Sequence, residues 1–210
     1  MRDEFLKRIR NELEEKEKAR EELIVKSREL RLNSSKAIAN IHSGNPEKSS
    51  EHLDKAGKIL EEVLELWNHH PELFYLAHDS VQEYVEAYVF THAIESLRLP
   101  EYLPVAIPQC VLPGLADCVG ELRRYALTMM VRGESLEKVE RVVGLMEKIY
   151  FILVEFDFHD RLTGNLRPKL DTARNLIEKT KSDLISAKVM EGIKSSIKPS
   201  AKNDLSPNPD

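Results

Sequence analysis

Cysteine is scarce in this sequence, and long apolar runs are missing. The 210 residues include two cysteines, Cys110 and Cys118, which are too few for a disulfide framework. No metal-site spacing surrounds them, so a reduced, cytoplasmic protein is expected. The first twenty residues are saturated with charge and lack the apolar stretch of a signal peptide. No run of about 18 uncharged apolar residues occurs, so we expect no membrane-spanning segment.

Glycine and net positive charge are also lacking. The 8 glycines are few beside the many Glu, Lys, Leu and Ala residues, a mix that favours long helices over sheets. The formal net charge is −5, so the sequence does not predict a basic surface over the whole molecule, as many nucleic-acid-binding domains have. Local basic patches can still bind nucleic acid, because the placement of charges matters more than their sum.

Apolar periodicity and the Gly and Pro positions predict a helical protein. The expected main helices are residues 2–43, 47–69, 71–97, 109–132, 135–156 and 166–190, with room for a short helix in the proline-rich connector 98–113. We therefore predict one all-α domain over residues 1–190, an antiparallel α-helical bundle or superhelix of about seven helices. Residues 191–210 lack apolar periodicity, which indicates a disordered C-terminal tail.

The centre of the chain is acidic and almost without cations. Between residues 59 and 122 the single Lys or Arg is Arg98. Asp79, Glu83 and Glu86 form one polar stripe on the 71–97 helix, which is otherwise apolar on nearly all sides and is predicted to be buried. A second acidic pair, four residues apart, lies on the next main helix. If the two helices pack together, their carboxylates can face each other.

Clustered carboxylates repel one another, so they either take up protons or require a cation. A hard divalent ion, Mg²⁺ or Mn²⁺, prefers oxygen ligands, activates water and stabilises charge on a phosphate. The competing interpretation is a solvated polar stripe, since 36 acidic residues produce such spacings often by chance. His78 is a further candidate for the stripe or a packed histidine, and His42 is a candidate cap of the first helix.

Basic residues gather elsewhere in the sequence. Arg28 and Arg31 share one helix face, and Arg123 and Arg124 directly follow the second acidic pair. Arginine suits phosphate oxygens, so we predict these four as RNA contacts, with ordinary surface charge as the alternative. Lys169 belongs to a further basic group near the start of the last helix. No aromatic base-stacking motif occurs, so recognition should follow shape and backbone.

Three segments resemble the translin/Trax family. They are VQEYVEAYVFTHAI at 81–94, GLADCVGELRRYALTMMVRGE at 114–134 and LRPKLDTARNLIEKTKSDL at 166–184. The resemblance spans about residues 20–190. It implies seven-helix subunits that assemble as closed octameric shells with RNA or DNA inside. The short connector between the first two segments is similar to that of archaeal homologues, which assemble alone, so a homo-octamer is expected.

The resemblance also implies a site. The Trax-type motifs match at Glu83, Glu86 and Asp117, implied metal ligands for Mg²⁺ or Mn²⁺, with Glu121 as a supporting catalytic acid. The implied function is a metal-dependent endoribonuclease that cleaves RNA phosphodiesters inside the oligomeric shell. The alternative is a non-catalytic binding protein of the translin type for RNA or single-stranded DNA. A scaffold protein, in which the acids only solvate a helix face, is the third possibility.

Overall fold

Residues 2–197, the part that the computed structural model describes, form helices joined by irregular connections and contain no strand, so the predicted all-α class is confirmed. Within this part seven α-helices and one 3₁₀ helix follow in the order α1 (Arg2–His42), α2 (Pro46–His69), η1 (Pro71–Leu76), α3 (His78–Ser96), α4 (Pro108–Val131), α5 (Leu136–Val154), α6 (Asp160–Thr163) and α7 (Leu166–Ile197). No helix of the described chain combines the length and apolarity needed to cross a membrane.

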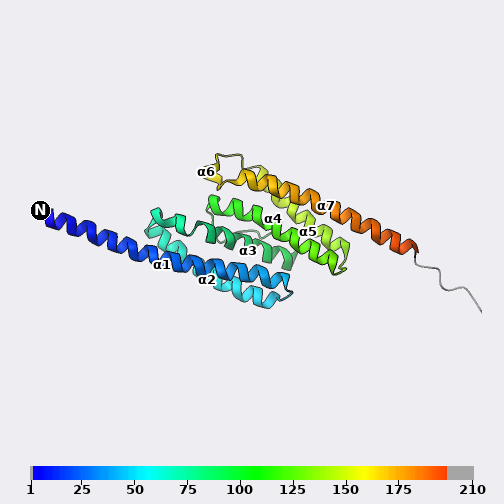
Figure 1. Ribbon diagram of the computed structural model, residues 1–210, viewed down its shortest axis with the longest axis horizontal. Helices are drawn as coiled ribbons and strands as arrows, with labels where there is room; N and C mark the ends of the chain where they lie inside the picture. The colour runs from blue at the N-terminus through cyan, green and yellow to red at the C-terminus, as the bar shows by residue number, and fades with distance from the viewer. Residues whose placement is uncertain (1, 198–210) are drawn as a thin grey trace, which may run out of the picture.

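The helices lie side by side in an order that differs from their order in the chain (Figure 1). Helix α1 packs against α2 on one side and α3 on the other, α3 packs against α4, and α4 packs against α5 and α7. The first part of α1 and the last part of α7 project from opposite ends of this body (Figure 1). The pair α3 and α4 therefore lies in the middle, between α1 and α7.

Helix α3 is the buried centre of the bundle, as its apolar sequence predicts. Val81, Val85, Val89 and Phe90 have no exposed surface. Burying this many large apolar side chains is the main favourable contribution to the fold. The polar residues of α3 are therefore confined to narrow strips of its surface, one of which faces α1 and α4.

Two expectations about element boundaries were wrong. The predicted helix at 71–97 is divided: Pro71–Leu76 form a 3₁₀ helix, and α3 begins at His78. Here Leu73 is buried and Phe74 packs on Trp67 with ring centroids 4.6 Å apart, so the chain turns against the end of α2. The last helix continues through residues 191–197, which the composition predicts as part of the tail, and no proline interrupts the chain before Pro199. The rest of the predicted tail, 198–210, lies outside the described residues.

Candidate functional site

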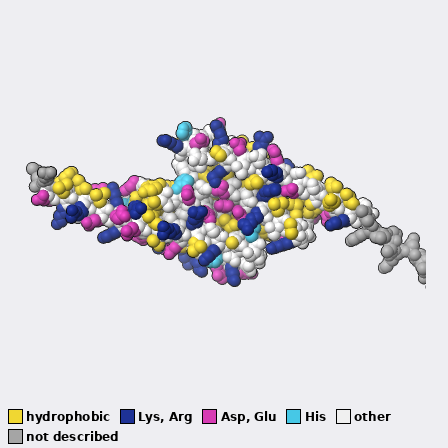
Figure 2. All heavy atoms as spheres, viewed as in Figure 1, with side chains coloured by type: hydrophobic (Ala, Val, Ile, Leu, Met, Phe, Trp, Pro, Cys, Tyr) yellow, Lys and Arg dark blue, Asp and Glu magenta, His cyan; other side chains and the backbone are white. Residues whose placement is uncertain are grey.

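Four carboxylates from α3 and α4 come together between α1 and α7, and we call them the carboxylate cluster: Glu83, Glu86, Asp117 and Glu121. Their proximity is seen at Glu86, where burial raises the carboxyl pKa to about 8 and the negative charges of the other three add to the shift. Figure 2 shows acidic side chains gathered near the middle of one face, with Lys and Arg around them. The two acidic pairs therefore lie close together, as the sequence predicts.

Asp79 and His78, the other predicted members of the stripe, lie outside the cluster. The Asp79 side chain is 92% exposed, and its Oδ1 lies 3.3 Å from Nδ1 of His78. Both residues are in the first turn of α3, where the helix starts after the 3₁₀ segment. Of the predicted acidic stripe on α3, only Glu83 and Glu86 therefore belong to the carboxylate cluster.

Asp117 is held by two donors from different helices. Nζ of Lys169, on α7, lies 2.5 Å from Oδ1 and 2.7 Å from Oδ2 of Asp117. Nε2 of Gln82, on α3, donates to Oδ2 at 2.7 Å. Asp117 consequently has a cation partner inside the chain, which sequence reasoning had placed only loosely near the last helix.

Glu83 is held by α1. Nε of Arg31 donates to its Oε2 at 2.9 Å, and the Ser35 hydroxyl donates to Oε1. The Arg31 side chain is 65% exposed, so its guanidinium still presents free donors to solvent. Arg31 therefore joins the cluster to the surface of α1.

Glu121 contacts a buried histidine. Nε2 of His42 lies 2.5 Å from Oε2 of Glu121, and this bond lowers the pKa of the carboxyl, with Arg124 at 3.6 Å contributing in the same direction. The His42 ring stacks on Phe90, with centroids 5.0 Å apart, and its Nδ1 is buried without a partner. His42 was expected to cap α1; its side chain fixes Glu121 instead.

Glu86 is the exception within the cluster. It makes no hydrogen bond or ion pair with any residue in 2–197, whereas each of its three acidic neighbours has a basic partner. An all-oxygen donor set around an unpaired carboxylate fits a hard divalent ion in its chemistry. Within the described part of the chain no three His, Cys, Asp or Glu side chains yet meet at metal-binding distance. An ion would therefore have to take carboxylates over from their basic partners.

The four predicted RNA-binding arginines fall into two groups. Arg28, Arg31 and Arg124 are exposed, and Arg28 has no hydrogen-bond or ion-pair partner within residues 2–197. Arg123 is only 19% exposed: it donates to Oγ1 of Thr180 at 2.7 Å and lies 3.1 Å from Asp183. Arg123 thus links α4 to α7, whereas Arg124 points to solvent.

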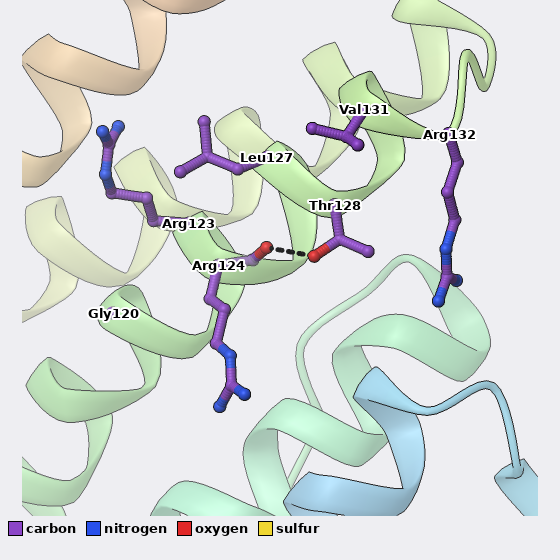
Figure 3. A pocket seen from close by; sticks show the side chains of 7 residues that line it. All are labelled: Gly120, Arg123, Arg124, Leu127, Thr128, Val131 and Arg132. Carbon is purple, nitrogen blue, oxygen red and sulfur yellow. Dashed lines mark hydrogen bonds between the residues drawn. The ribbon is translucent and has the colours of Figure 1, made fainter.

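A basic hollow of about 500 Å³ runs along α4 beside the cluster (Figure 3). Its lining consists of Gly120, Arg123, Arg124, Leu127, Thr128, Val131 and Arg132. Arg124 and Arg132 extend toward the same side of the helix, and Arg123 extends away from them (Figure 3). Sequence reasoning missed Arg132, although its spacing of eight residues from Arg124 places both on one helix face.

Comparison with known proteins gives a consistent assignment. No family model matches the chain. An uncharacterized protein of Methanocaldococcus jannaschii is 32% identical over 180 residues, 84% of this chain and 79% of that protein. The crystal structure of AfC3PO is 47% identical to this chain in sequence and matches it with a TM-score of 0.84. The match covers 90% of this chain and 98% of the AfC3PO chain.

Two further solved structures agree with this assignment. AfC3PO in complex with duplex RNA is 46% identical to this chain, with a TM-score of 0.82. NeC3PO, at 22% identity and a TM-score of 0.79, supports the fold alone. AfC3PO and NeC3PO are C3PO proteins of the translin/Trax family. On the sequence identity, the coverage and the shared helical fold, this chain belongs to the translin/Trax family.

Proposed function

We propose that this protein binds RNA and cleaves it as a Mg²⁺-dependent endoribonuclease at the carboxylate cluster. The observation that carries this proposal is the unpaired Glu86 carboxyl, partly buried among three further carboxylates. Such an arrangement is electrostatically unfavourable without a cation, and perturbed carboxyls in this setting are typical of functional sites. The AfC3PO complex with duplex RNA supports RNA as the substrate class.

Each member of the cluster has a proposed role. Glu83, Glu86 and Asp117 hold Mg²⁺ or Mn²⁺, and Glu121, fixed by His42, is the supporting acid. When bound, the ion supplies activation of water and stabilisation of charge on the phosphate. Gln82 keeps Asp117 oriented through its hydrogen bond to Oδ2. Since this bond uses only Oδ2, Oδ1 of Asp117 is available to the ion once Lys169 moves away.

The exposed arginines are the proposed contacts to the RNA backbone. Arg28 and Arg31 lie on α1, and Arg124 and Arg132 line the hollow on α4. Arginine forks bind phosphate oxygens with two parallel hydrogen bonds, which positions a strand without reading its bases. Since Arg123 is occupied by α7, we assign it a structural role instead.

Cleavage of labelled RNA in Mg²⁺ tests the proposal. Glu86→Gln should lower the rate by roughly 100-fold or more, since even groups behind the metal ligands cost about 10–100-fold. Asp79→Asn is the matched control on the same helix, and it should cleave like the wild type because its side chain is 92% exposed outside the cluster. Equal rates for Glu86→Gln and the wild type would refute the catalytic site.

One observation favours the second candidate, RNA binding without cleavage. Arg31 and Lys169 each form an ion pair with one of the outer carboxylates, so the chain itself supplies part of the neutralising charge. A protein of this kind would retain duplex or single-stranded RNA and leave it intact with Mg²⁺ or Mn²⁺. Gel-shift and cleavage measurements on the same RNA separate the two functions.

We also propose assembly into a homo-octamer. The projecting part of α1 exposes Phe5, Leu6, Ile9 and Leu13, and that of α7 exposes Ile185, Val189, Met190 and Ile193. Rows of exposed large apolar side chains along one helix are typical of subunit contacts. Native mass spectrometry with and without RNA measures the number of subunits, and a monomer at working concentration would refute the assembly.

A further inference from the structure

We propose that Lys169 occupies the position of the divalent ion at Asp117 and, once the ion displaces it, binds a phosphate of the RNA. This inference rests on the proposed function. It assigns Lys169 two successive partners, one in the ion-free protein and one in the RNA complex. The acidic cluster is then kept together before the ion arrives.

The contact between Lys169 and Asp117 has the features of a replaceable cation. The Nζ atom lies between both carboxylate oxygens, at 2.5 Å and 2.7 Å. The two side chains are only 33% and 29% exposed, so the pair is screened less than an ion pair in open water. A lysine has a compact charge on a flexible four-carbon stem, and it can therefore move away without a shift of the backbone.

Charge balance explains why the ammonium must leave. A divalent ion at Asp117 would stand next to the lysine charge, and like charges at such distances repel strongly. An RNA phosphate approaching the same place carries the opposite charge. Exchange of partners would satisfy all four groups: Asp117 and its neighbours would hold the ion, and the Lys169 ammonium would bind the phosphate.

The contact to Gln82 supports this order of events. Gln82 Nε2 donates to Oδ2 of Asp117 independently of the lysine. Asp117 therefore remains oriented toward the cluster after Lys169 has moved. Glu86, which has no partner of its own within residues 2–197, gains one when the ion enters.

The test compares Lys169→Met with Lys181→Met in the full chain. Lys181 is also on α7, and its Nζ lies 2.5 Å from Oε1 of Glu147, an ion pair of the same kind outside the cluster. Mn²⁺ affinity is measured without RNA by electron paramagnetic resonance, and duplex RNA affinity is measured with saturating Mn²⁺. A third variant, Lys169→Arg, keeps the positive charge.

Opposite changes in the two affinities are expected for Lys169→Met. Its Mn²⁺ binding should be about tenfold tighter or more, since a competing unit charge in a partly buried site has been removed. Its RNA binding should be weaker, because a phosphate contact is lost. Lys181→Met should leave both affinities unchanged, and Lys169→Arg should retain wild-type Mn²⁺ affinity.

Each of the other outcomes refutes one part of the proposal for Lys169. Mn²⁺ binding that is unchanged or weaker in Lys169→Met refutes the competition between Lys169 and the ion for Asp117. Weaker binding would instead show that Lys169 has a structural role. Tighter Mn²⁺ binding with unchanged RNA affinity refutes the phosphate contact. If neither the wild type nor Lys169→Met binds Mn²⁺, the proposed metal-dependent function fails together with this inference. If the wild type binds Mn²⁺ and cleaves RNA, and Lys169→Met has the same Mn²⁺ and RNA affinities, only the proposed exchange at Lys169 fails.

Discussion

Gly114 lies directly against the backbone of Gln82: a Cβ atom at residue 114 would be 2.7 Å from the Gln82 carbonyl oxygen and 3.0 Å from Cβ of Val85. This contact brings α4 to α3 at the level of the carboxylate cluster. One turn along α4, Asp117 accepts its hydrogen bond from the Gln82 side chain. The missing side chain at 114 is therefore a condition for the site.

Gly114→Ala should destabilise the protein by about 1–3 kcal/mol, because the added methyl group forces two buried backbones apart. Urea unfolding monitored by circular dichroism measures the change. The matched control is Gly144→Ala in α5, where a Cβ meets nothing within 4 Å. That control should be stabilised by about 0.5–1 kcal/mol through its helix propensity. Equal effects of the two substitutions would contradict the close approach.

The pH dependence of stability should differ between the wild type and Glu86→Gln. The Glu86 pKa of about 8 lies above its ordinary value of 4.5, so between these values the folded protein binds a proton that the unfolded chain has lost. The contribution of this group to the free energy of unfolding is therefore fully present below pH 4.5 and is lost as pH rises to 8. Glutamine does not titrate and avoids that loss.

Urea unfolding at pH 5, 7 and 9, in buffer with a chelator, measures this difference. The stability of Glu86→Gln relative to the wild type should increase with pH, by up to roughly 1.4 kcal/mol per pH unit. Asp79→Asn provides the control, since its exposed carboxyl lies outside the cluster. A constant difference between Glu86→Gln and the wild type across this range would show that Glu86 is ionised normally.

Arg123 and Arg124 should separate stability from RNA binding. Arg123→Ala removes the bonds to Thr180 and Asp183 on α7 and should cost about 1–3 kcal/mol of unfolding free energy. Arg124→Ala, at a side chain 64% exposed, should change stability by less than about 0.5 kcal/mol. Thermal and urea unfolding of both variants measure these effects.

RNA affinity should depend on Arg124. Its removal should weaken binding at all sequences and reduce the dependence of affinity on salt by about one phosphate contact. A salt series of gel shifts measures that slope. Unchanged slopes for Arg124→Ala would exclude its contact with the backbone.

Both cysteines should be unreactive in the folded protein. Burial raises the pKa of the Cys110 thiol to about 12 and raises that of Cys118 well above its usual range. The thiolate is the reactive form, so a thiol reagent at neutral pH should modify neither residue before unfolding and both in concentrated guanidinium. Rapid modification of the native chain would contradict the burial of these side chains.

The acids of the site could be predicted from the sequence, and their partners could not. Glu83 with Glu86, and Asp117 with Glu121, are three or four residues apart, which places each pair on one helix face whatever the tertiary structure. Their basic partners are distant in the chain: Arg31 and Lys169 are each 52 residues from the acids they bind, and His42 is 79 residues from Glu121. Such pairs depend on how helices are placed side by side.

The same reason explains the different positions of Arg123 and Arg124. Adjacent residues on a helix point about 100° apart, so one of them faces α7 and the other faces solvent. Local periodicity identifies a helix face but not the neighbour that covers it. The continuation of α7 through residues 191–197 does not follow from composition, because Gly192 and the polar residues around it disfavour a helix, although no proline precedes Pro199.

The long separation between Lys169 and the carboxylates has a consequence for protein synthesis. A ribosome adds residues from the N-terminus, so all four acids have been polymerised before the codon for Lys169 is read. An incomplete chain that stops after α5 contains the acidic residues but lacks the ammonium group that pairs with Asp117. Nascent or truncated chains of this kind therefore carry a surplus of negative charge at the centre of the bundle, which the finished polypeptide reduces only when its final helix docks.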